Sequence, residues 1–330
     1  MAKNKTEKYN SPVAAIFTGI GDLFKRSENE LNLENIPPLD GKRVLITGAS
    51  SGLGFATAVD LASRGAHVIL AQRSGIPHKG EQVKKESGSD RVDMIRMDLS
   101  DLDSLQSLTG EIRERFGQLD IIVCNAAMVA NKSRAIKEGL DEMFVVNYFA
   151  KFLLLNRILA EGILNHAGPF TPRIIFVASE SHRNPSSFDW EGFGTYKPYG
   201  IKQSVAMYGY YKLLLLTMAN EFSRRINKDG KVTFSVFALC PGPVNSNIAR
   251  EAPRIFQPLL KLVFGIFFRS PKKACQPVSY LAASSEVEGK TGEYMFLMQK
   301  KEMDKKATDP QNGKRLWELS ERLSKQILTQ

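Results

Sequence analysis

Short apolar runs rich in β-branched residues alternate with longer segments of helical periodicity along most of this chain. Runs of this kind are typical of buried strands, and the longer segments between them are typical of crossover helices. Strands are predicted at 43–47, 67–71, 92–96, 119–124, 173–178, 232–239 and 293–297. Helices are predicted at 54–64, 101–116, 142–164 and 204–225. The alternation predicts an α/β fold with a doubly wound parallel sheet, helices on both faces, and a ligand at the carboxyl ends of the strands.

The chain length favours one main domain with a tail at each end. Its 330 residues are 43% apolar and 24% charged, which is ordinary globular composition, and no internal repeat interrupts them. The predicted divisions are an amino-terminal arm at 1–39, a catalytic domain at 40–300 and a helical tail at 301–330.

The cysteines and histidines give no sign of a disulfide framework or a metal site. Cys124, Cys240 and Cys275 are widely spaced in apolar contexts, which is typical of reduced core thiols in a cytosolic protein. The four histidines include no pair at metal-ligand spacing. We therefore expect no bound metal.

A net charge of +10 makes nucleic acid and anionic membranes candidate partners, beside the simpler interpretation of a solvated basic surface. No nucleic-acid-binding motif accompanies the charge, so we expect no nucleic acid partner. No apolar run is long enough to span a bilayer. The segment 12–24 lacks the cleavage site of a signal peptide and is predicted to be a surface amphipathic arm. The expected location is cytoplasmic, with peripheral attachment to a membrane as an open alternative.

A glycine-rich turn follows the first predicted strand and precedes the first predicted helix. It reads G-A-S-S-G-L-G, with glycines at Gly48, Gly52 and Gly54 and with Ser50, Ser51 and Leu53 between them. Glycines let backbone amides approach a phosphate, and the helix amino terminus adds partial positive charge. This placement predicts a phosphate-binding loop of a dinucleotide site.

Tyr208 and Lys212 stand four residues apart in a segment predicted to be helical, so a phenol and an ammonium group share one face. A tyrosine has an ordinary pKa of about 10, too high for proton exchange at neutral pH. A cation within about 4 to 6 Å stabilises the phenolate and lowers this pKa. The pair is a candidate acid–base device, although the same spacing also arises by chance.

The glycine turn T-G-A-S-S-G-L-G resembles the coenzyme loop of the short-chain dehydrogenase/reductase family, and further motifs follow in the family's order over roughly residues 40 to 300. The resemblance implies a Rossmann-type sheet with strand order 3-2-1-4-5-6-7. It implies a catalytic set of Asn147, Ser179, Tyr208 and Lys212. The implied coenzyme contacts comprise the glycine turn, Asp98, Leu99, Asn125, Pro241, Gly242, Val244 and Ser246, together with Tyr208 and Lys212.

Each catalytic residue carries a role implied by the resemblance. Tyr208 exchanges the hydroxyl proton, Ser179 holds the substrate oxygen, and Lys212 lowers the pKa of the tyrosine and binds the nicotinamide ribose. Asn147 keeps its helix locally open and supports a proton relay. Cys124 and Ala127 depart from the family's usual residues after the fourth strand, so the loop there is expected to be slightly reshaped.

The end of the second strand bears on coenzyme choice. It reads L-A-Q-R-S, with Arg73 where an NAD-specific fold places a carboxylate for the ribose 2′-hydroxyl. A cation beside a hydroxyl suits a 2′-phosphate, so NADP(H) is the predicted cofactor. The alternative is that Arg73 stacks on the adenine of either coenzyme.

The predicted lid, at about 247–272, contains an aromatic segment too short to span a membrane. Phe256, Leu260, Phe264 and Phe267 in this segment are expected to cover a lipophilic substrate, contact a membrane surface, or pack as an ordinary buried helix. The long interval between Ser179 and Tyr208 resembles the retinol dehydrogenase branch, which includes relatives acting on sterols, polyprenols and protochlorophyllide.

The resemblance implies an NADP(H)-dependent oxidoreductase that interconverts an alcohol and its aldehyde or ketone on a lipophilic small molecule such as a retinoid, sterol or polyprenol. A light-dependent protochlorophyllide-type reductase and a catalytically silent, membrane-associated NADPH-binding protein stay open as alternatives. Helices resembling the family's dimerising pair are compatible with a homodimer.

Overall fold

The apolar runs form one sheet in the computed structural model, which describes residues 36–165, 168–244 and 269–328. The strand order is β3-β2-β1-β4-β5-β6-β7-β8. All neighbouring strands are parallel except the last pair, β7 and β8. The strands are β1 (Arg43–Thr47), β2 (His67–Gln72), β3 (Val92–Arg96), β4 (Ile121–Cys124), β5 (Arg173–Val177), β6 (Ser235–Cys240), β7 (Glu293–Phe296) and β8 (Gln299–Lys300). The predicted doubly wound sheet and its order are confirmed, with a short antiparallel strand added at the edge.

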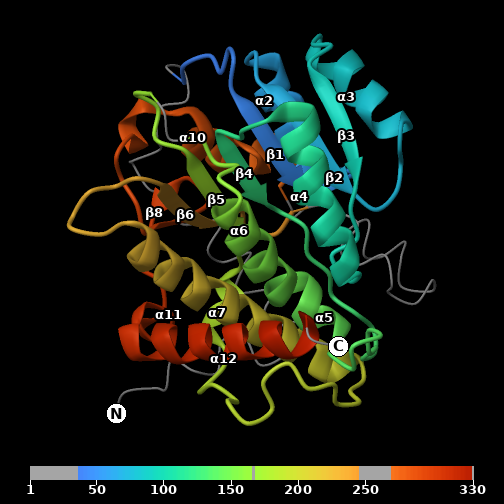
Figure 1. The fold of residues 1–330 in the computed structure, drawn as a ribbon, viewed down its shortest axis with the longest axis vertical. Coiled ribbons are helices and arrows are strands. Elements are labelled where there is room, and N and C mark those ends of the chain that lie inside the picture. The colour runs from blue at the N-terminus through green and yellow to red at the C-terminus, as the bar shows by residue number, and fades with distance from the viewer. Residues whose placement is uncertain (1–35, 166–167, 245–268, 329–330) are drawn as a thin grey trace.

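Helices cover both faces of this sheet (Figure 1). The helices are α2 (Gly52–Ser63), α3 (His78–Ser87), α4 (Leu102–Phe116), α5 (Glu142–Phe144), α6 (Ala150–Ala160), α7 (Ile201–Ile226), α9 (Pro271–Ala274), α10 (Gln276–Ala283), α11 (Lys305–Thr308) and α12 (Pro310–Leu328). One core cluster joins one face of the sheet to α4, α6 and α7, and the other joins the opposite face to α2, α3 and α10.

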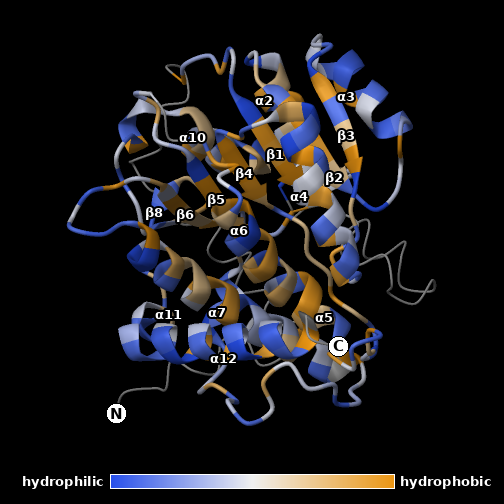
Figure 2. Ribbon diagram, in the orientation of Figure 1, coloured by the Kyte–Doolittle hydropathy of each residue, from blue (hydrophilic) through white to orange (hydrophobic). Residues whose placement is uncertain are grey.

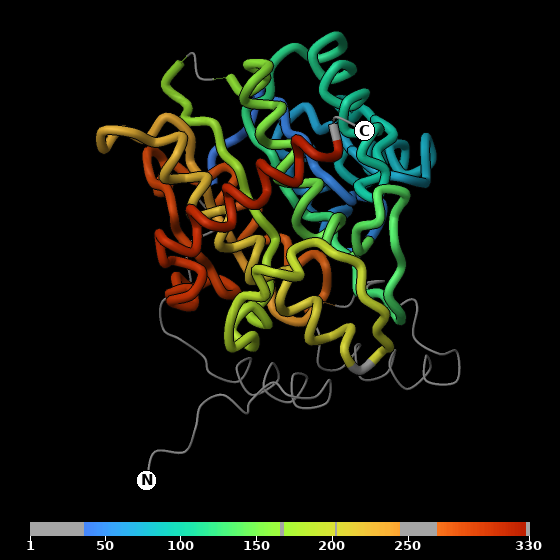
Figure 3. Tube along the Cα trace, turned by 60° about the horizontal axis from the view of Figure 1, so that its bottom comes forward, coloured from blue at the N-terminus to red at the C-terminus, as the bar shows by residue number. Residues whose placement is uncertain are grey.

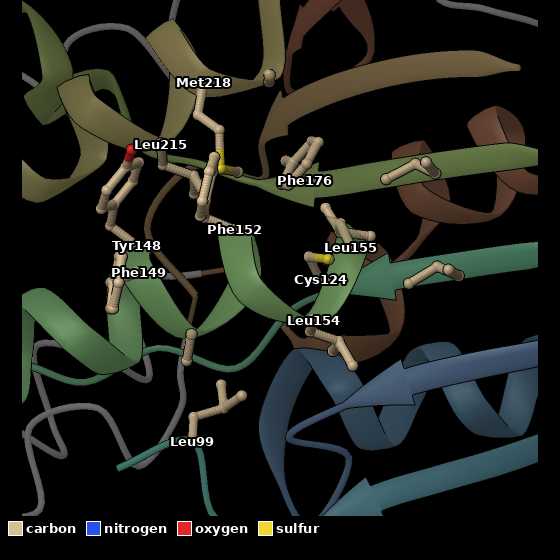
Figure 4. Packing of buried hydrophobic residues seen from close by; sticks show 14 of the residues in the cluster. Leu99, Cys124, Tyr148, Phe149, Phe152, Leu154, Leu155, Phe176, Leu215 and Met218 are labelled. Atoms are coloured by element: carbon tan, nitrogen blue, oxygen red, sulfur yellow. The ribbon is translucent and has the colours of Figure 1, made fainter. Parts of the chain in front are cut away.

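Successive residues of a strand pack alternately into these two cores, as expected for a sheet buried on both sides. Leu45 of β1 belongs to the first cluster, whereas its neighbours Val44 and Ile46 belong to the second. The strands are accordingly apolar along their length, while the outer helices carry polar residues (Figure 2). On the first face, Leu155 of α6 lies near Cys124 of β4 in the packed interior (Figure 4).

The carboxy-terminal helix α12 packs on α7 and extends the first core outward (Figures 1 and 3). The Trp317 ring lies 5.0 Å from the Phe152 ring of α6 in an edge-on contact. The hydroxyls of Tyr148 and Ser320 are 2.5 Å apart and both are buried. The helix that ends the described chain is therefore an integral layer over α6 and α7.

Some predicted boundaries differ from the structure. The helix expected at 142–164 is divided into α5, a π-helical turn (Val145–Phe149) and α6, and it ends at Ala160. The fourth and sixth strands begin at Ile121 and Ser235, later than the predicted 119 and 232. Ser246, the arm before residue 36 and the lid residues 247–268 lie outside the described residues.

Among the described residues, the stretch Glu142–Ala160 is long and apolar enough to cross a membrane by length and composition. However, 67% of this window is buried inside the domain. Phe149, Phe152 and Leu155 of this stretch belong to the first core cluster, and Figure 4 shows Leu155 beside Cys124 of β4. We therefore interpret it as a core helix.

Candidate active site

A cavity of about 420 Å³ opens at the carboxyl ends of the parallel strands. Fifteen of the predicted site residues line it: Gly48, Ser50, Ser51, Leu53, Gly54, Arg73, Asp98, Leu99, Asn125, Ser179, Tyr208, Lys212, Pro241, Gly242 and Val244. Gly52 and Asn147 are not part of its wall. Gly52 belongs to the turn that enters α2, and Asn147 lies behind the wall in the π-helical turn.

The glycine turn brings backbone close to the cavity. Gly48 has a φ of +70°, and a Cβ there would lie 2.8 Å from the Cα of Ala126. A Cβ at Gly54 would lie 2.5 Å from the carbonyl oxygen of Gly48. The hydroxyl of Ser51, the residue before α2, makes no capping hydrogen bond. The first amides of α2 are thus left without a side-chain cap, as an anion-binding helix terminus requires.

Asn125 braces the ends of β1 and β4. Its side-chain amide donates to the carbonyl oxygens of Thr47 and Gly48 at 3.0 and 2.9 Å. Its backbone amide donates to the Thr47 hydroxyl at 3.1 Å. These bonds fix the glycine turn against the next strand and use the side-chain amide nitrogen of Asn125 for bracing.

Ser179 leaves β5 in an extended conformation and begins a short 3₁₀ turn (Glu180–Arg183). Its hydroxyl oxygen accepts from the backbone amide and from the hydroxyl of Ser181, at 3.3 and 2.9 Å. Both Ser179 and Tyr208 line the cavity. Burial raises the pKa of Tyr208, Cys240 adds to the rise, and the neighbouring Ser179 hydroxyl partly offsets it. The two hydroxyls thus meet at the cavity wall with the phenol in its neutral form.

Lys212 lies one turn after Tyr208 on α7 and is only 1% exposed. Its ammonium group donates to the carbonyl oxygen of Val177 at 2.8 Å and lies 5.4 Å from the centre of the Tyr208 ring. Burial, reinforced by the charge of Lys151, lowers the pKa of Lys212 to about 7. The expected lowering of the tyrosine pKa is not seen, because desolvation drives both buried groups toward their neutral forms.

Asn147 is fully buried in the π-helical turn. Its amide nitrogen donates to the carbonyl oxygens of Met128 and Met143, both at 2.9 Å, and its oxygen accepts from the Met128 amide at 3.2 Å. The helix is locally open here, since the side chain takes over a main-chain acceptor. Asn147 consequently fixes the loop after β4, which lines the cavity at Met128.

Arg73 and Asp98 form the far end of the cavity wall. The Arg73 guanidinium lies 3.6 Å from the Asp98 carboxylate, and the arginine side chain is about half exposed. Beside it, Gln72 is buried, and its side-chain oxygen has no hydrogen-bond partner. Two charged groups, one of each sign, therefore line this end of the cavity.

The family comparisons agree with this geometry. A family model described as short chain dehydrogenase matches residues 42–192. Mouse retinol dehydrogenase 14 is 32% identical over 297 residues, which covers 86% of each chain. The chain belongs to the short-chain dehydrogenase/reductase family.

Its relatives place this dehydrogenase/reductase in the retinol dehydrogenase-like branch. Mouse polyprenol dehydrogenase is 27% identical over 308 residues, covering 92% of this chain and 89% of its own. Among solved structures, the angucycline C-6 ketoreductase LanV with bound NADP is 26% identical, with a TM-score of 0.58, and covers 79% of this chain and 95% of its own. The protein is accordingly a short-chain dehydrogenase/reductase acting on CH–OH groups, and its family binds nicotinamide coenzymes.

The cavity residues of this dehydrogenase/reductase fit such a coenzyme. A Cβ at Gly48 or Gly54 would collide with neighbouring protein atoms, so glycine is needed to hold this turn in place, and the uncapped start of α2 offers amide donors to a phosphate. The guanidinium of Arg73 adds a charged donor group at the far end.

The sequence patterns missed two polar features near the site. Arg134 and Glu142 pair with each other at the cavity wall. Lys151, four residues after Asn147, is 1% exposed and donates to the carbonyl oxygen of Val146 at 2.5 Å. Burial lowers the pKa of Lys151 to about 8. The four-residue spacing of Asn147 and Lys151 was the available signal, since both then share one helix face.

Proposed function

We propose that this enzyme uses NADP(H) to interconvert an alcohol and its aldehyde or ketone on a lipophilic substrate, with Tyr208, Ser179, Lys212 and Asn147 as its working residues. The observation that carries the proposal is the meeting of Ser179 and Tyr208 hydroxyls at the cavity, with Lys212 buried behind the phenol.

In the reductive direction, Tyr208 donates its proton to the carbonyl oxygen of the substrate. Burial raises the pKa of the phenol and keeps that proton in place at neutral pH. Ser179 donates a hydrogen bond to the same substrate oxygen and orients it toward Tyr208. The bound nicotinamide supplies or accepts the hydride. In the oxidative direction, the phenolate of Tyr208 takes the alcohol proton.

Lys212 and Asn147 support this arrangement of the Tyr208 and Ser179 hydroxyls. Lys212 provides a positive charge near the phenol and a donor for the coenzyme ribose. Asn147 fixes the loop at Met128 and leaves the main chain of the π-helical turn open for proton exchange. Neither side chain contacts the Tyr208 hydroxyl through a direct hydrogen bond among the described contacts.

The coenzyme preference follows from the far end of the cavity. The guanidinium of Arg73 offers a planar set of donors suited to a 2′-phosphate. The Arg73 guanidinium lines the cavity 3.6 Å from the Asp98 carboxylate, with about half of its side chain exposed.

The proposed lipophilic substrate class is supported by the aromatic segment at 255–268. The names of the relatives, which act on retinol and polyprenol, agree with it. The direct test is to follow NADPH and NADH oxidation with panels of retinal, steroid ketones, polyprenals and fatty aldehydes. Turnover with NADPH and a lipophilic carbonyl supports the proposal. Preferential use of NADH, or turnover confined to small polar carbonyls, contradicts it.

A further inference from the structure

We propose that His182 is a positioning residue that couples the segment after β8 to the backbone of Ser179. This inference rests on the proposed function, in which the Ser179 hydroxyl holds the substrate oxygen. His182 lies in the 3₁₀ turn three residues after Ser179, and its side chain is 0% exposed. It does not line the cavity, so its effect on the reaction must pass through Ser179.

The two ring nitrogens of His182 have different backbone partners. Nδ1 lies 2.7 Å from the carbonyl oxygen of Ser179, which also accepts the His182 backbone amide at 3.1 Å. The backbone amide of Asp304 donates to Nε2 at 3.2 Å. One imidazole therefore joins Ser179 to Asp304, which lies 122 positions after His182 in the chain.

These partners determine the protonation state of the ring. A carbonyl oxygen only accepts and a backbone N–H only donates, so both bonds exist together only if Nδ1 carries the hydrogen and Nε2 carries none. The opposite tautomer places a lone pair against a carbonyl oxygen and a hydrogen against an amide hydrogen. The imidazolium form loses the bond from Asp304.

Burial and the charge of Arg183 favour the neutral form of His182, whereas the Ser179 carbonyl and the carboxylates of Glu180 and Asp304 favour the charged form. Glu180 and Arg183 flank it on the same turn, Tyr294 of β7 contacts its ring edge-on at 5.6 Å, and Asp304 approaches from the segment before α11. The Glu180 carboxylate is already engaged, since it accepts from the Tyr294 hydroxyl at 2.7 Å and from Lys301 at 2.5 Å. Burial lowers the pKa of His182 to about 4.

The segment before α11 therefore supports the backbone of Ser179 through His182. Ser179 is extended, with φ of −155°, and its hydroxyl direction depends on the turn that begins there. The bond from Nδ1 fixes the carbonyl group of Ser179, and the bond from Asp304 fixes the orientation of the imidazole ring. Loss of this support leaves the Ser179 hydroxyl present but less well directed at the substrate oxygen.

Three substitutions at His182 test its two hydrogen bonds separately. In His182→Asn the amide nitrogen takes the place of Nδ1 and still donates to Ser179. In His182→Gln the longer amide takes the place of Nε2 and still accepts from Asp304. His182→Phe keeps the ring beside Tyr294 and loses both bonds. His78→Asn, on the exposed start of α3, is the matched control.

We expect His182→Gln and His182→Phe to lower kcat by about tenfold or more while the Kd for NADPH changes little, and we expect His182→Asn to recover most of the loss. Wild-type kcat in a folded His182→Phe variant would overturn the inference. Equal losses of kcat in the Asn and Gln variants would also overturn it, because the bond to Ser179 would then matter no more than the bond from Asp304.

The tautomer provides a test that does not depend on turnover. The chain has four histidines, so the ¹⁵N signals of His182 can be assigned by their absence in His182→Asn. A protonated Nδ1 and an unprotonated Nε2 at pH 7 are expected, and a protonated Nε2 would overturn the inference. If Tyr208→Phe kept full activity, the proposed function would fail while this tautomer assignment stood.

Discussion

The Lys212 ammonium group lies 5.4 Å from the centre of the Tyr208 ring, yet it donates its hydrogen bond to the carbonyl oxygen of Val177. The main chain of β5 therefore fixes the position of this lysine beside the phenol, and no direct hydrogen bond joins the two side chains among the described contacts. Since burial lowers the pKa of Lys212 to about 7, the ammonium and the free amine are of similar stability near neutral pH. Small changes around this lysine should consequently change the protonation balance of the site.

Replacing Lys212 by methionine should impair two functions at once. The change keeps the buried chain length but removes both the charge near Tyr208 and the donor proposed for the coenzyme ribose. We expect at least a tenfold rise in the Kd for NADPH by fluorescence titration, and a larger fall in kcat. Lys85→Met, on the exposed side of α3, is the control. A loss confined to binding or to turnover would show that one of the two roles is misassigned.

The two reaction directions should differ in pH dependence. Burial raises the pKa of Tyr208, so the phenol keeps its proton at neutral pH and the phenolate becomes populated only as the pH rises. Alcohol oxidation, which needs the phenolate, should accelerate with increasing pH, and carbonyl reduction should not. Initial rates in both directions at saturating coenzyme, between about pH 6 and 10, test this. An oxidation rate that declines over this range contradicts the assignment of Tyr208 as the base.

Arg73→Ala should change coenzyme selectivity more than activity. The substitution removes the cation proposed for the 2′-phosphate, so KM for NADPH should rise by about ten- to a hundredfold. KM for NADH should change little, which makes NADH kinetics an internal control for folding. Equal effects on the two coenzymes would favour adenine stacking by Arg73 instead.

Asn147→Leu should destabilise the fold as well as the site. Asn147 is fully buried, and the change leaves the Met128 amide and two carbonyl oxygens without their partner. The expected loss is about 3 kcal/mol in the free energy of unfolding, measured by urea denaturation. Asn156→Leu in α6 removes one half-buried bond to the Phe152 carbonyl and should cost about 1 kcal/mol or less. Similar losses in the two variants would mean that the π-helical turn does not depend on Asn147.

The parallel sheet could be predicted because strands buried on both faces are continuous apolar runs, as in β1 and β5. Helix α3 was missed because its sequence, H-K-G-E-Q-V-K-K-E-S, gives one apolar position and no periodic stripe. The divided helix around Asn147 was also missed. Its apolar periodicity continues through the π-helical turn, and the side-chain bonds that open the turn leave no periodic signal.

The motif residues at the cavity could be predicted because they follow strand ends that meet at one edge of a parallel sheet. The surroundings of His182 could not be predicted from the sequence. Its partners are Ser179, just after β5, and Asp304, in the segment before α11, and both partners are backbone groups that any residue type would provide. The direction in which the pKa of Tyr208 shifts depends on burial, and residue spacing alone does not predict burial.

The most direct test of the account is the turnover of Tyr208→Phe with NADPH and a lipophilic carbonyl substrate. This change removes one hydroxyl and keeps the ring that packs in the core. We predict that kcat falls by about a thousandfold or more, since the general acid is gone, while NADPH binds with nearly unchanged affinity. Wild-type turnover in this variant would contradict the proposed mechanism.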